Sequence, residues 1–412
     1  MSQFNGLLKN YKFVALWVSQ VLSQLTINIL SFTILIHIFE QTGSTIATSF
    51  LWVAYALPAI IFGPFAAAWV DLQDKKKILM ISNFLQALVV VGFSVLLYKK
   101  LIYLSYVVVF LYSLLNQFYV PAEAASLPVI VKEKDLPSAN SLFFITQQSS
   151  LVLGFGFAGI LDQIFGYRPT LILVAISLFV AFISVSFLKP LKPSTTLPGN
   201  FEKRVKKFFD QIIEGYYFIK NTKEVLFPFS ILLGIQVILA ILVTNLPRIA
   251  TDIMKVSVAS SSFVVILPAG IGAIVATFLI SRFLTVKTNK RNIILYSLFS
   301  FSIAVLFISI FVPLLQINYL RILVGGILFV IVGMGAVGTL VPAVTYLQES
   351  TPKDLLGRVF GNFWFLTTAA TIIPILFSAT ITDLLGVRVL TILLGSVCLG
   401  ATLFVYSKVK NL

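Results

Sequence analysis

Long apolar runs alternate along this chain with short clusters of charged residues. A helix crosses a bilayer core of about 30 Å with roughly 20 apolar residues. Twelve runs are long enough to do so, and each is predicted to be helical because lipid offers no partner to backbone polar groups. The predicted spans are residues 12–38, 44–70, 77–98, 102–126, 139–161, 169–188, 225–247, 257–280, 291–313, 319–346, 359–382 and 387–407. The pattern therefore predicts an all-α polytopic membrane protein with twelve transmembrane helices.

Composition agrees with this prediction, and the placement of basic residues orients it. Hydrophobic residues make up 58% of the chain and charged residues only 11%, too few to cover the surface of a soluble domain. Loops on alternate sides of the predicted membrane carry 23 and 7 of the 30 Lys and Arg residues. Because basic loops remain on the cytoplasmic side, we expect both termini there. Basic loops against an anionic inner leaflet also account for the net charge of +15, so we expect no nucleic-acid partner.

Several classes of function lack the residues that they need. The chain has a single histidine, His37, and a single cysteine, Cys398, which excludes a multi-histidine metal site and an internal disulfide. It has neither a phosphate-binding glycine loop with its lysine nor the serine turn of hydrolases. We therefore expect no enzyme activity, no cofactor and no metal. The N-terminal residues lead directly into a long apolar run, which is typical of an uncleaved anchor.

A long polar stretch divides the twelve spans into two sets of six. We expect six-helix bundles at residues 1–190 and 224–412, joined by a cytoplasmic linker at 191–223. The linker begins rich in Pro, Ser and Thr and continues with apolar residues at helical spacing, typical of a helix in the headgroup plane; a soluble cap on the bundle is the alternative. Both halves contain Val-Pro-Ala followed by Lys-Asp-Leu, at 120–136 and 341–355. Such parallel six-helix repeats are a recurrent plan among secondary transporters.

The loop after the second span carries a recognisable motif. Residues 67–77 read AAWVDLQDKKK and resemble the signature loop of the major facilitator superfamily, in which a small residue precedes an Asp followed by basic residues. Asp71, Lys75 and Lys76 fit this pattern, whereas Ala67 stands where the family has glycine. The Asp74 variant is similar to one in the branch of enterobactin exporters and macrolide-efflux proteins. Other segments resemble the same branch: 118–122, 139–142, 213–216 and 348–361.

This resemblance implies a transporter that opens alternately to each side of a bacterial inner membrane. It implies most often an exporter driven by the proton gradient, and we expect a monomer that expels small amphiphilic organic compounds, drug-like or siderophore-like. It also implies that spans one, four, seven and ten, with parts of five and eleven, line the substrate cavity. Phe155 departs from the pattern, because exporters of the superfamily have proline at this place in the fifth span.

The signature loop also has a physical interpretation. The carboxylate of Asp71 can accept hydrogen bonds from the free N–H groups of a neighbouring helix N-terminus, where the helix dipole favours an anion. Lys75 and Lys76 can pair with acids across the interface between the halves. We expect these three residues to form a latch that closes the cytoplasmic side. An ordinary solvated turn is the alternative.

Polar side chains within spans are costly in lipid and usually face a cavity or another helix. Gln20, Gln24 and Asn28 recur at four-residue steps, which places them on one face of the first span. Tyr112 and Tyr119 would add aromatic surface from the fourth. The predicted cavity residues are Gln20, Gln24, Asn28, Asn116, Gln147, Gln236, Asn362 and Trp364. Hydrogen bonding between helices uses the same residue types and is the alternative.

Proton coupling requires a protonatable group within a span. The candidates are Glu123, near the cytoplasmic end of the fourth span, and His37, near the outer end of the first. Each could instead be an interface residue. Three functions remain open from the sequence: a proton-coupled exporter, an importer or facilitator of a small solute, and a lipid-handling or non-transporting membrane protein.

Overall fold

The computed structural model describes residues 5–96, 102–192, 201–283, 289–352 and 355–409. Within these ranges the chain forms helices and no strands, and twelve helices are long and apolar enough to cross a membrane. The predicted all-helical class and the number of spans are therefore confirmed. Of the other predicted features, linker residues 193–200 and the Lys353-Asp354 pair of the second repeat lie outside the described residues.

Internal contacts divide the chain into two units, and each is described by itself. Unit 1 comprises Met1–Ile38 and Phe50–Asp210, and unit 2 comprises Phe39–Ser49 and Gln211–Leu412. The loop between the first two spans thus groups with unit 2 by its contacts. The other division falls within a helix of the linker, α8 (Phe201–Asn221).

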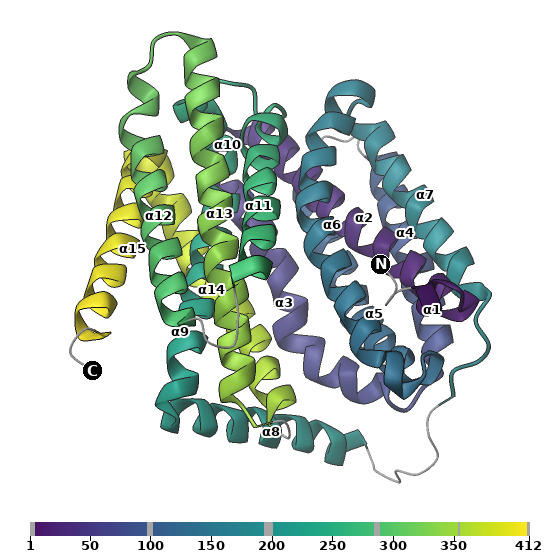
Figure 1. Cartoon of the computed structure of the whole chain (residues 1–412). Helices are drawn as coiled ribbons and strands as arrows, with labels where there is room; N and C mark the ends of the chain where they lie inside the picture. Colours follow the sequence, from purple (N-terminus) through teal and green to yellow (C-terminus); the bar gives the residue numbers. More distant parts are fainter. Residues whose placement is uncertain (1–4, 97–101, 193–200, 284–288, 353–354, 410–412) are drawn as a thin grey trace. The chain divides into compact units, whose positions relative to one another are not determined.

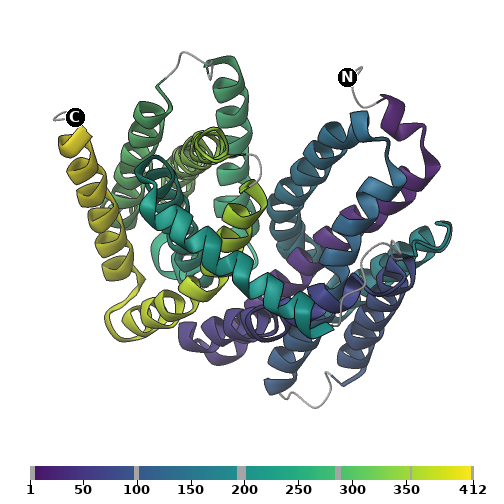
Figure 2. The ribbon, with the colours of Figure 1, turned by 90° about the horizontal axis from the view of Figure 1, so that it is seen from below.

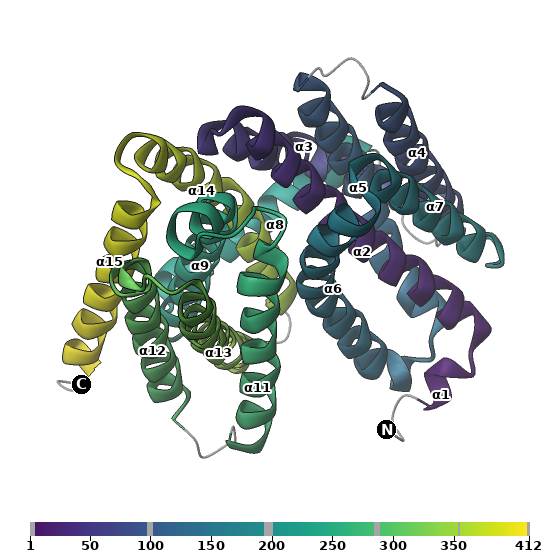
Figure 3. The ribbon, with the colours of Figure 1, turned by 90° about the horizontal axis from the view of Figure 1, so that it is seen from above.

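Unit 1 contains the first six spans. Its elements are α1 (Asn5–Leu8), α2 (Tyr11–Thr42), α3 (Thr45–Val70), α4 (Lys75–Leu96), α5 (Tyr103–Ile130), the short turn η2 (Glu133–Asp135), α6 (Leu136–Phe165) and α7 (Tyr167–Ser186). The ends of α2 and α3 reach into the loop that belongs to unit 2. Helix α4 packs against α5 and α7 (Figure 3). An apolar core that includes Phe13, Leu16, Leu79 and Val185 joins α2, α4 and α7.

Unit 2 contains the last six spans. Its elements, after the second part of α8, are α9 (Lys223–Thr244), α10 (Leu246–Arg248), the π-helical turns η3 (Ile249–Met254) and η4 (Ser262–Ile266), α11 (Leu267–Phe283), α12 (Lys290–Ile310), the turn η5 (Val312–Leu314), α13 (Asn318–Ser350), α14 (Leu356–Leu385) and α15 (Val387–Val409). Helix α13 lies between α11 and α12 and packs against both (Figures 1 and 3).

Glycines allow α13 to approach both neighbours closely. A Cβ on Gly333 would overlap the carbonyl oxygen of Ala269 in α11, and a Cβ on Gly338 would overlap the hydroxyl of Ser297 in α12. Small residues at helix contacts are typical of membrane proteins, where dispersion between backbones replaces the hydrophobic effect as the attraction. These two lines of contact, which we call the glycine seams of α13, hold the centre of unit 2 together.

The second part of α8 lies crosswise to the spans of unit 2 (Figures 1 and 2). The side-chain amide of Asn362 in α14 donates to the carbonyl oxygen of Ile212 at 3.0 Å, and Arg358 forms an ion pair with Glu214. A Cβ on Gly215 would overlap the Asn362 amide, so α8 crosses α14 at this glycine. The linker helix is therefore attached to unit 2 by specific contacts.

Candidate functional site

The interior of unit 1 contains buried polar side chains arranged in layers between α2, α4 and α5. In the first layer, the hydroxyl oxygens of Ser19 and Tyr119 lie 2.9 Å apart, and the amide nitrogen of Asn83 donates to Ser19 Oγ at 3.0 Å. All three side chains have no exposed surface. Each comes from a different helix, so this layer links α2, α4 and α5.

A second layer repeats the same residue types two helical turns away, later in α2 and earlier in α5. Thr26 Oγ1 and Tyr112 Oη lie 3.1 Å apart, and Gln86 Nε2 donates to the backbone oxygen of Tyr112 at 3.4 Å. Tyr112 and Tyr119, which we expected beside the cavity, are thus buried inside unit 1, because α2 supplies them with hydroxyl partners. We call the two layers the polar column; its members are Ser19, Thr26, Asn83, Gln86, Tyr112 and Tyr119.

Glu123 lies one helical turn beyond Tyr119 on the same face of α5. Its side chain is 6% exposed, and its Oε1 accepts no hydrogen bond from any residue that the structure describes. The side-chain oxygens of Asn83 and Gln86 in the polar column are buried and unpartnered in the same way. A carboxyl group inside a span is the kind of group that takes up and releases a coupling proton.

The predicted polar stripe of the first span faces α6. Gln20 Nε2 donates to the carbonyl oxygen of Phe143 at 2.9 Å, and Asn28 packs so closely on Gly154 that a Cβ there would overlap it. Asn28 Nδ2 also donates to the carbonyl oxygen of Gln24 at 2.7 Å. The contacts of Gln20 with Phe143 and of Asn28 with Gly154 are those of the interhelical alternative. A role for the three residues in binding substrate stays a prediction.

The other predicted cavity residues differ in exposure. Gln147 and Trp364 are exposed, and Asn116 and Gln236 are half-buried. Asn362 is 1% exposed, and its amide nitrogen donates to the two carbonyl oxygens of Ile212 and Arg358. The structure therefore leaves Gln147, Trp364, Asn116 and Gln236 with the side-chain surface that contact with a substrate would need.

His37, the second coupling candidate, is packed against an aromatic ring. Its imidazole stacks on the phenol of Tyr167 at the start of α7, with ring centroids 3.8 Å apart and planes at 10°. Phe93 of α4 meets the same Tyr167 ring edge-on, with ring centroids 6.4 Å apart. His37 therefore belongs to an aromatic contact among α2, α4 and α7.

The lysines of the signature loop bond to the backbone of unit 1. Lys75 Nζ donates to the carbonyl oxygen of Asp71 at 3.1 Å. Lys76 Nζ donates to the carbonyl oxygen of Ser186, the last residue of α7, at 2.7 Å. The Asp71 side chain is exposed. The two lysines thus hold the loop and the end of α7 together, and the latch itself stays a prediction.

Asp74 has a structural role that the sequence analysis did not assign. Its Oδ1 accepts hydrogen bonds from the backbone N–H groups of Lys76, at 3.0 Å, and of Leu191, at 2.9 Å. An acid directly before a helix is a signal for an N-cap. The bond to Leu191 was not visible in the sequence, because it joins positions far apart along the chain.

Unit 2 contains a second carboxylate cluster, centred on Asp383 at the end of α14. Its carboxylate accepts hydrogen bonds from the backbone N–H groups of Thr45, at 2.9 Å, and Ile46, at 3.0 Å, and from the Ser44 hydroxyl at 2.7 Å. These groups form the N-terminus of α3, whose first N–H groups have no partner within the helix. A carboxylate from α14 therefore caps α3 at the loop that belongs to unit 2.

Arg248 supports this cap. Its Nη2 lies 3.7 Å from the Asp383 carboxylate and donates to the carbonyl oxygen of Gly43 at 2.6 Å. Its guanidinium also lies over the ring of Phe39, 5.2 Å from the centroid. We call Asp383 and Arg248 the α3 cap. Nothing in the sequence indicated which acid would cap α3.

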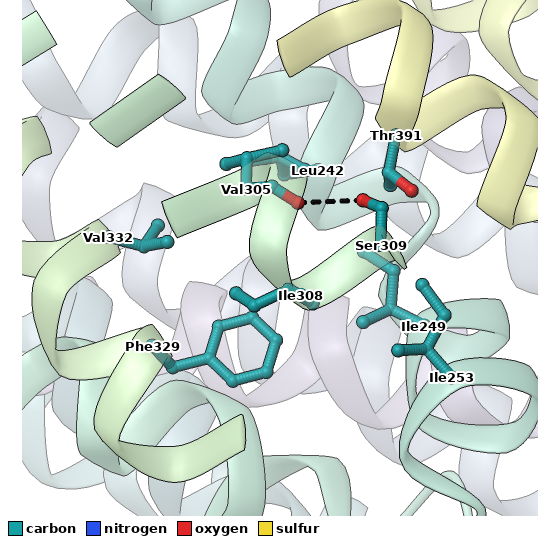
Figure 4. Close-up of a pocket in the computed structure, with 9 residues that line it drawn as sticks. All are labelled: Leu242, Ile249, Ile253, Val305, Ile308, Ser309, Phe329, Val332 and Thr391. Atoms are coloured by element: carbon teal, nitrogen blue, oxygen red, sulfur yellow. Dashed lines mark hydrogen bonds between the residues drawn. The ribbon is translucent and has the colours of Figure 1, made fainter. Parts of the chain in front are cut away.

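A small cavity lies inside unit 2, between α9, η3, α12, α13 and α15. It has room for about 20 Å³, close to one water molecule, whereas sites for drug-sized molecules measure ~300–1,000 Å³. Its lining is apolar apart from Ser309 and Thr391, and Figure 4 shows the Ser309 hydroxyl bonded to the carbonyl oxygen of Val305. By its size, this cavity cannot hold an organic substrate.

Comparisons with known proteins agree with the resemblance noted in the sequence. Macrolide efflux protein A of Streptococcus pyogenes is 24% identical over 97% of both chains. The uncharacterized MFS-type transporter YfiS of Bacillus subtilis is 24% identical over 87% of this chain and 83% of its own. Each match extends along most of both proteins.

Solved structures show the same fold. A POT family transporter in complex with 5-aminolevulinic acid has a TM-score of 0.70 at 13% identity, over 95% of both chains. The nucleoside transporter NupG has a TM-score of 0.67 at 12% identity, over 94% of this chain and 99% of its own. Residues 16–374 match the family profile of the Major Facilitator Superfamily. The chain therefore belongs to the major facilitator superfamily of secondary transporters.

Proposed function

We propose that this protein is a proton-coupled exporter of small amphiphilic organic compounds, drug-like or siderophore-like, in a bacterial inner membrane. The observation that carries the proposal is the buried carboxyl group of Glu123 within a span. Its Oε1 accepts no hydrogen bond from the residues that the structure describes. A relative that matches along nearly the whole chain is named for macrolide efflux, which supports export and an organic substrate.

The coupling would work by exchange at one carboxyl group. Glu123 takes up a proton when unit 1 presents it to the outer side and releases that proton to the cytoplasm, while substrate leaves in the opposite direction. One charge crossing 100 mV supplies about 2.3 kcal/mol. That free energy maintains roughly a fifty-fold gradient of an uncharged substrate, because 1.4 kcal/mol is tenfold. A single buried carboxyl is therefore sufficient for active export.

The remaining parts of the proposal concern substrate contact and closure. Gln147, Trp364, Asn116 and Gln236 are the proposed substrate contacts, since their side chains keep accessible surface. The signature loop, with its exposed Asp71 carboxylate, is the proposed latch on the cytoplasmic side. We propose that the protein acts as a monomer.

Flux measurements in proteoliposomes test this function. A macrolide and an amphiphilic fluorescent dye serve as probes, with a pH gradient imposed across the membrane. We expect the gradient to drive the wild-type protein to move a probe uphill, and Glu123→Gln to bind the probe without gradient-driven movement. Glu133→Gln, which alters an exposed acid in the nearby turn η2, is the matched control and should behave as wild type. Uphill movement by Glu123→Gln equal to wild type would exclude Glu123 as the coupling group.

Import or downhill facilitation is the second candidate, and Phe155 favours it. This residue replaces the proline of the exporter signature and stacks on Phe32 of α2, with ring centroids 5.1 Å apart. The fifth span therefore lacks the break that proline introduces into a helix. Inward movement of a probe down its own gradient, unaffected by the pH gradient, would support this candidate over export.

Orientation is tested separately. The uneven distribution of Lys and Arg supports a cytoplasmic location of both termini. Reporter domains fused after Tyr167 and Asn318 should be active outside, and those fused after Lys77 and Lys223 should be active inside. An internal signal after Tyr167 would contradict this topology.

A further inference from the structure

We infer that Tyr119 is a positioning residue that sets the pH at which Glu123 exchanges its proton, an inference that rests on the proposed coupling role of Glu123. The observation behind it is a difference between the two layers of the polar column. In the first layer the tyrosine hydroxyl is free to change its acceptor. In the second layer it is not.

The first layer leaves the direction of its central hydrogen bond open. The Asn83 amide nitrogen can only donate, so Ser19 Oγ accepts from it at 3.0 Å. The proton of Ser19 is not engaged elsewhere among the described residues, and either Ser19 or Tyr119 can be the donor in the bond between them. When Ser19 donates, the hydroxyl proton of Tyr119 becomes available for another acceptor.

Glu123 is that acceptor. It follows Tyr119 by one turn on the same face of α5, a spacing at which side chains meet. Its Oε1 is buried without a hydrogen bond from the described residues, and a charged carboxylate would need a donor there. Tyr119 therefore donates to Ser19 when Glu123 is neutral and turns to Glu123 when the carboxyl is charged. No covalent bond changes in Tyr119, and the transferred proton is the one on Glu123.

The second layer provides an internal comparison. The Thr26 hydroxyl donates to the carbonyl oxygen of Ser23 at 2.9 Å, so Tyr112 has to be the donor in its bond to Thr26. One turn from Tyr112 along α5, in the same direction as Glu123 from Tyr119, stands Asn116 rather than an acid. Tyr112 thus has the same chemistry and burial as Tyr119 but a fixed direction and no carboxyl to serve.

Other ionisable groups on the helices around α5 lie toward the helix ends. Lys75 and Lys76 donate to the backbone of Asp71 and Ser186. Tyr55 of α3 lies beside Tyr112, which is about three helical turns from Glu123 along α5. The others are Tyr11, Lys12, His37 and Glu40 on α2, Lys77 on α4, Tyr103 and Tyr106 on α5 and Asp162 on α6. Tyr119 is the ionisable side chain one turn from Glu123 on its own helix.

The pH dependence of flux in proteoliposomes tests the inference, with the same macrolide or dye as the probe. We expect Tyr119→Phe to move the midpoint of the profile to higher pH by about 1 unit, because a hydrogen bond to the charged carboxyl is lost. Tyr112→Phe removes an equally buried hydroxyl and should keep the wild-type midpoint. Ser19→Ala should move the midpoint to lower pH, because Tyr119 then loses one of its two hydroxyl partners, Ser19 and Ser23.

The outcomes separate this inference from the proposed function. Glu123→Gln should abolish the pH dependence; if it keeps the wild-type profile, the coupling role itself is wrong. If Glu123→Gln abolishes the dependence but Tyr119→Phe keeps the wild-type midpoint, only the inference is overturned. Equal shifts in Tyr119→Phe and Tyr112→Phe would also overturn it, since they would indicate a general effect of packing. Should Tyr119→Phe not fold, the sign of the Ser19→Ala shift decides.

Discussion

The two units hold their helices together by different means. In unit 1, the polar column links α2, α4 and α5 through hydroxyl and amide side chains. In unit 2, the glycine seams bring α13 into backbone contact with α11 and α12. The helix contacts of unit 1 thus involve ionisable side chains, whereas those in the middle of unit 2 involve close packing of backbones.

The free energies of hydrogen bonds in membranes support this difference between the units. A hydrogen bond between helices in a membrane contributes about 0.6 kcal/mol on average. The few bonds of the polar column therefore add little stability, and its unpartnered oxygens on Asn83 and Gln86 reduce that further. Apolar packing would hold the three helices at least as well. The proton exchange that we propose for Glu123 would account for the column better than the stability of unit 1 does.

The largest effect is expected at the glycine seams. Gly333→Ala places a methyl group on the carbonyl oxygen of Ala269, so α11 and α13 have to separate. We expect a loss of about 3 kcal/mol, the upper range for overpacking, and little folded protein in detergent. Gly326→Ala is the matched control on the same helix, because the added atom would meet Pro268 at an ordinary 4.0 Å. Thermal unfolding followed by tryptophan fluorescence would measure both; similar melting temperatures would show that the seam is not essential.

The next effect concerns transport rather than folding. Asp71→Asn removes a charge from an exposed carboxylate, and we expect transport to fall roughly tenfold, since an acid at a helix N-terminus is worth up to ~2 kcal/mol. Its membrane abundance and melting temperature should not change.

Asp74→Ala is the contrasting variant in the same loop. It removes the acceptor of two backbone N–H groups and should lower the melting temperature instead. Normal flux by Asp71→Asn at equal abundance would leave only the solvated turn as an explanation of the motif.

The spans were predictable because lipid imposes a single requirement on each of them. Length and hydropathy suffice to recognise a helix that crosses a bilayer, and the twelve predicted runs match the helices of the structure. The rotation of each helix about its axis was not predictable, because neighbouring helices determine it. Gln20 and Asn28 share one face as expected, but the sequence could not show that this face meets α6.

The candidate site was likewise predictable only in part. Glu123 could be chosen from the sequence because acids within spans are rare. The partners that make it interpretable could not, since Ser19, Asn83 and Tyr119 are far apart in the chain and ordinary in type. Asp383 was missed for a similar reason. It stands at the end of a span, where an acid is common, and the helix that it caps lies more than 300 positions earlier.

A smaller effect is expected at the α3 cap, formed by Asp383 and Arg248. Asp383→Ala leaves the first N–H groups of α3 without their acceptor, which should cost about 1 kcal/mol and lower the melting temperature by a few degrees. Asp252→Ala is the control, because it removes a more exposed partner of the same Arg248, 3.9 Å away. Equal melting temperatures for the two variants would show that the cap contributes no more than a surface ion pair.

The smallest effect is expected in the second layer of the polar column. Thr26→Val and Tyr112→Phe each remove one hydroxyl of a buried pair while keeping the shape of the side chain. A double-mutant cycle on thermal unfolding should give a coupling energy of about 0.6 kcal/mol, the average for such bonds in membranes. Flux and its pH dependence should stay as in wild type, because Tyr112 serves no acid. A coupling energy several times larger would mean that unit 1 depends on its polar column for stability, and the contrast with the glycine seams of unit 2 would then be one of chemistry alone.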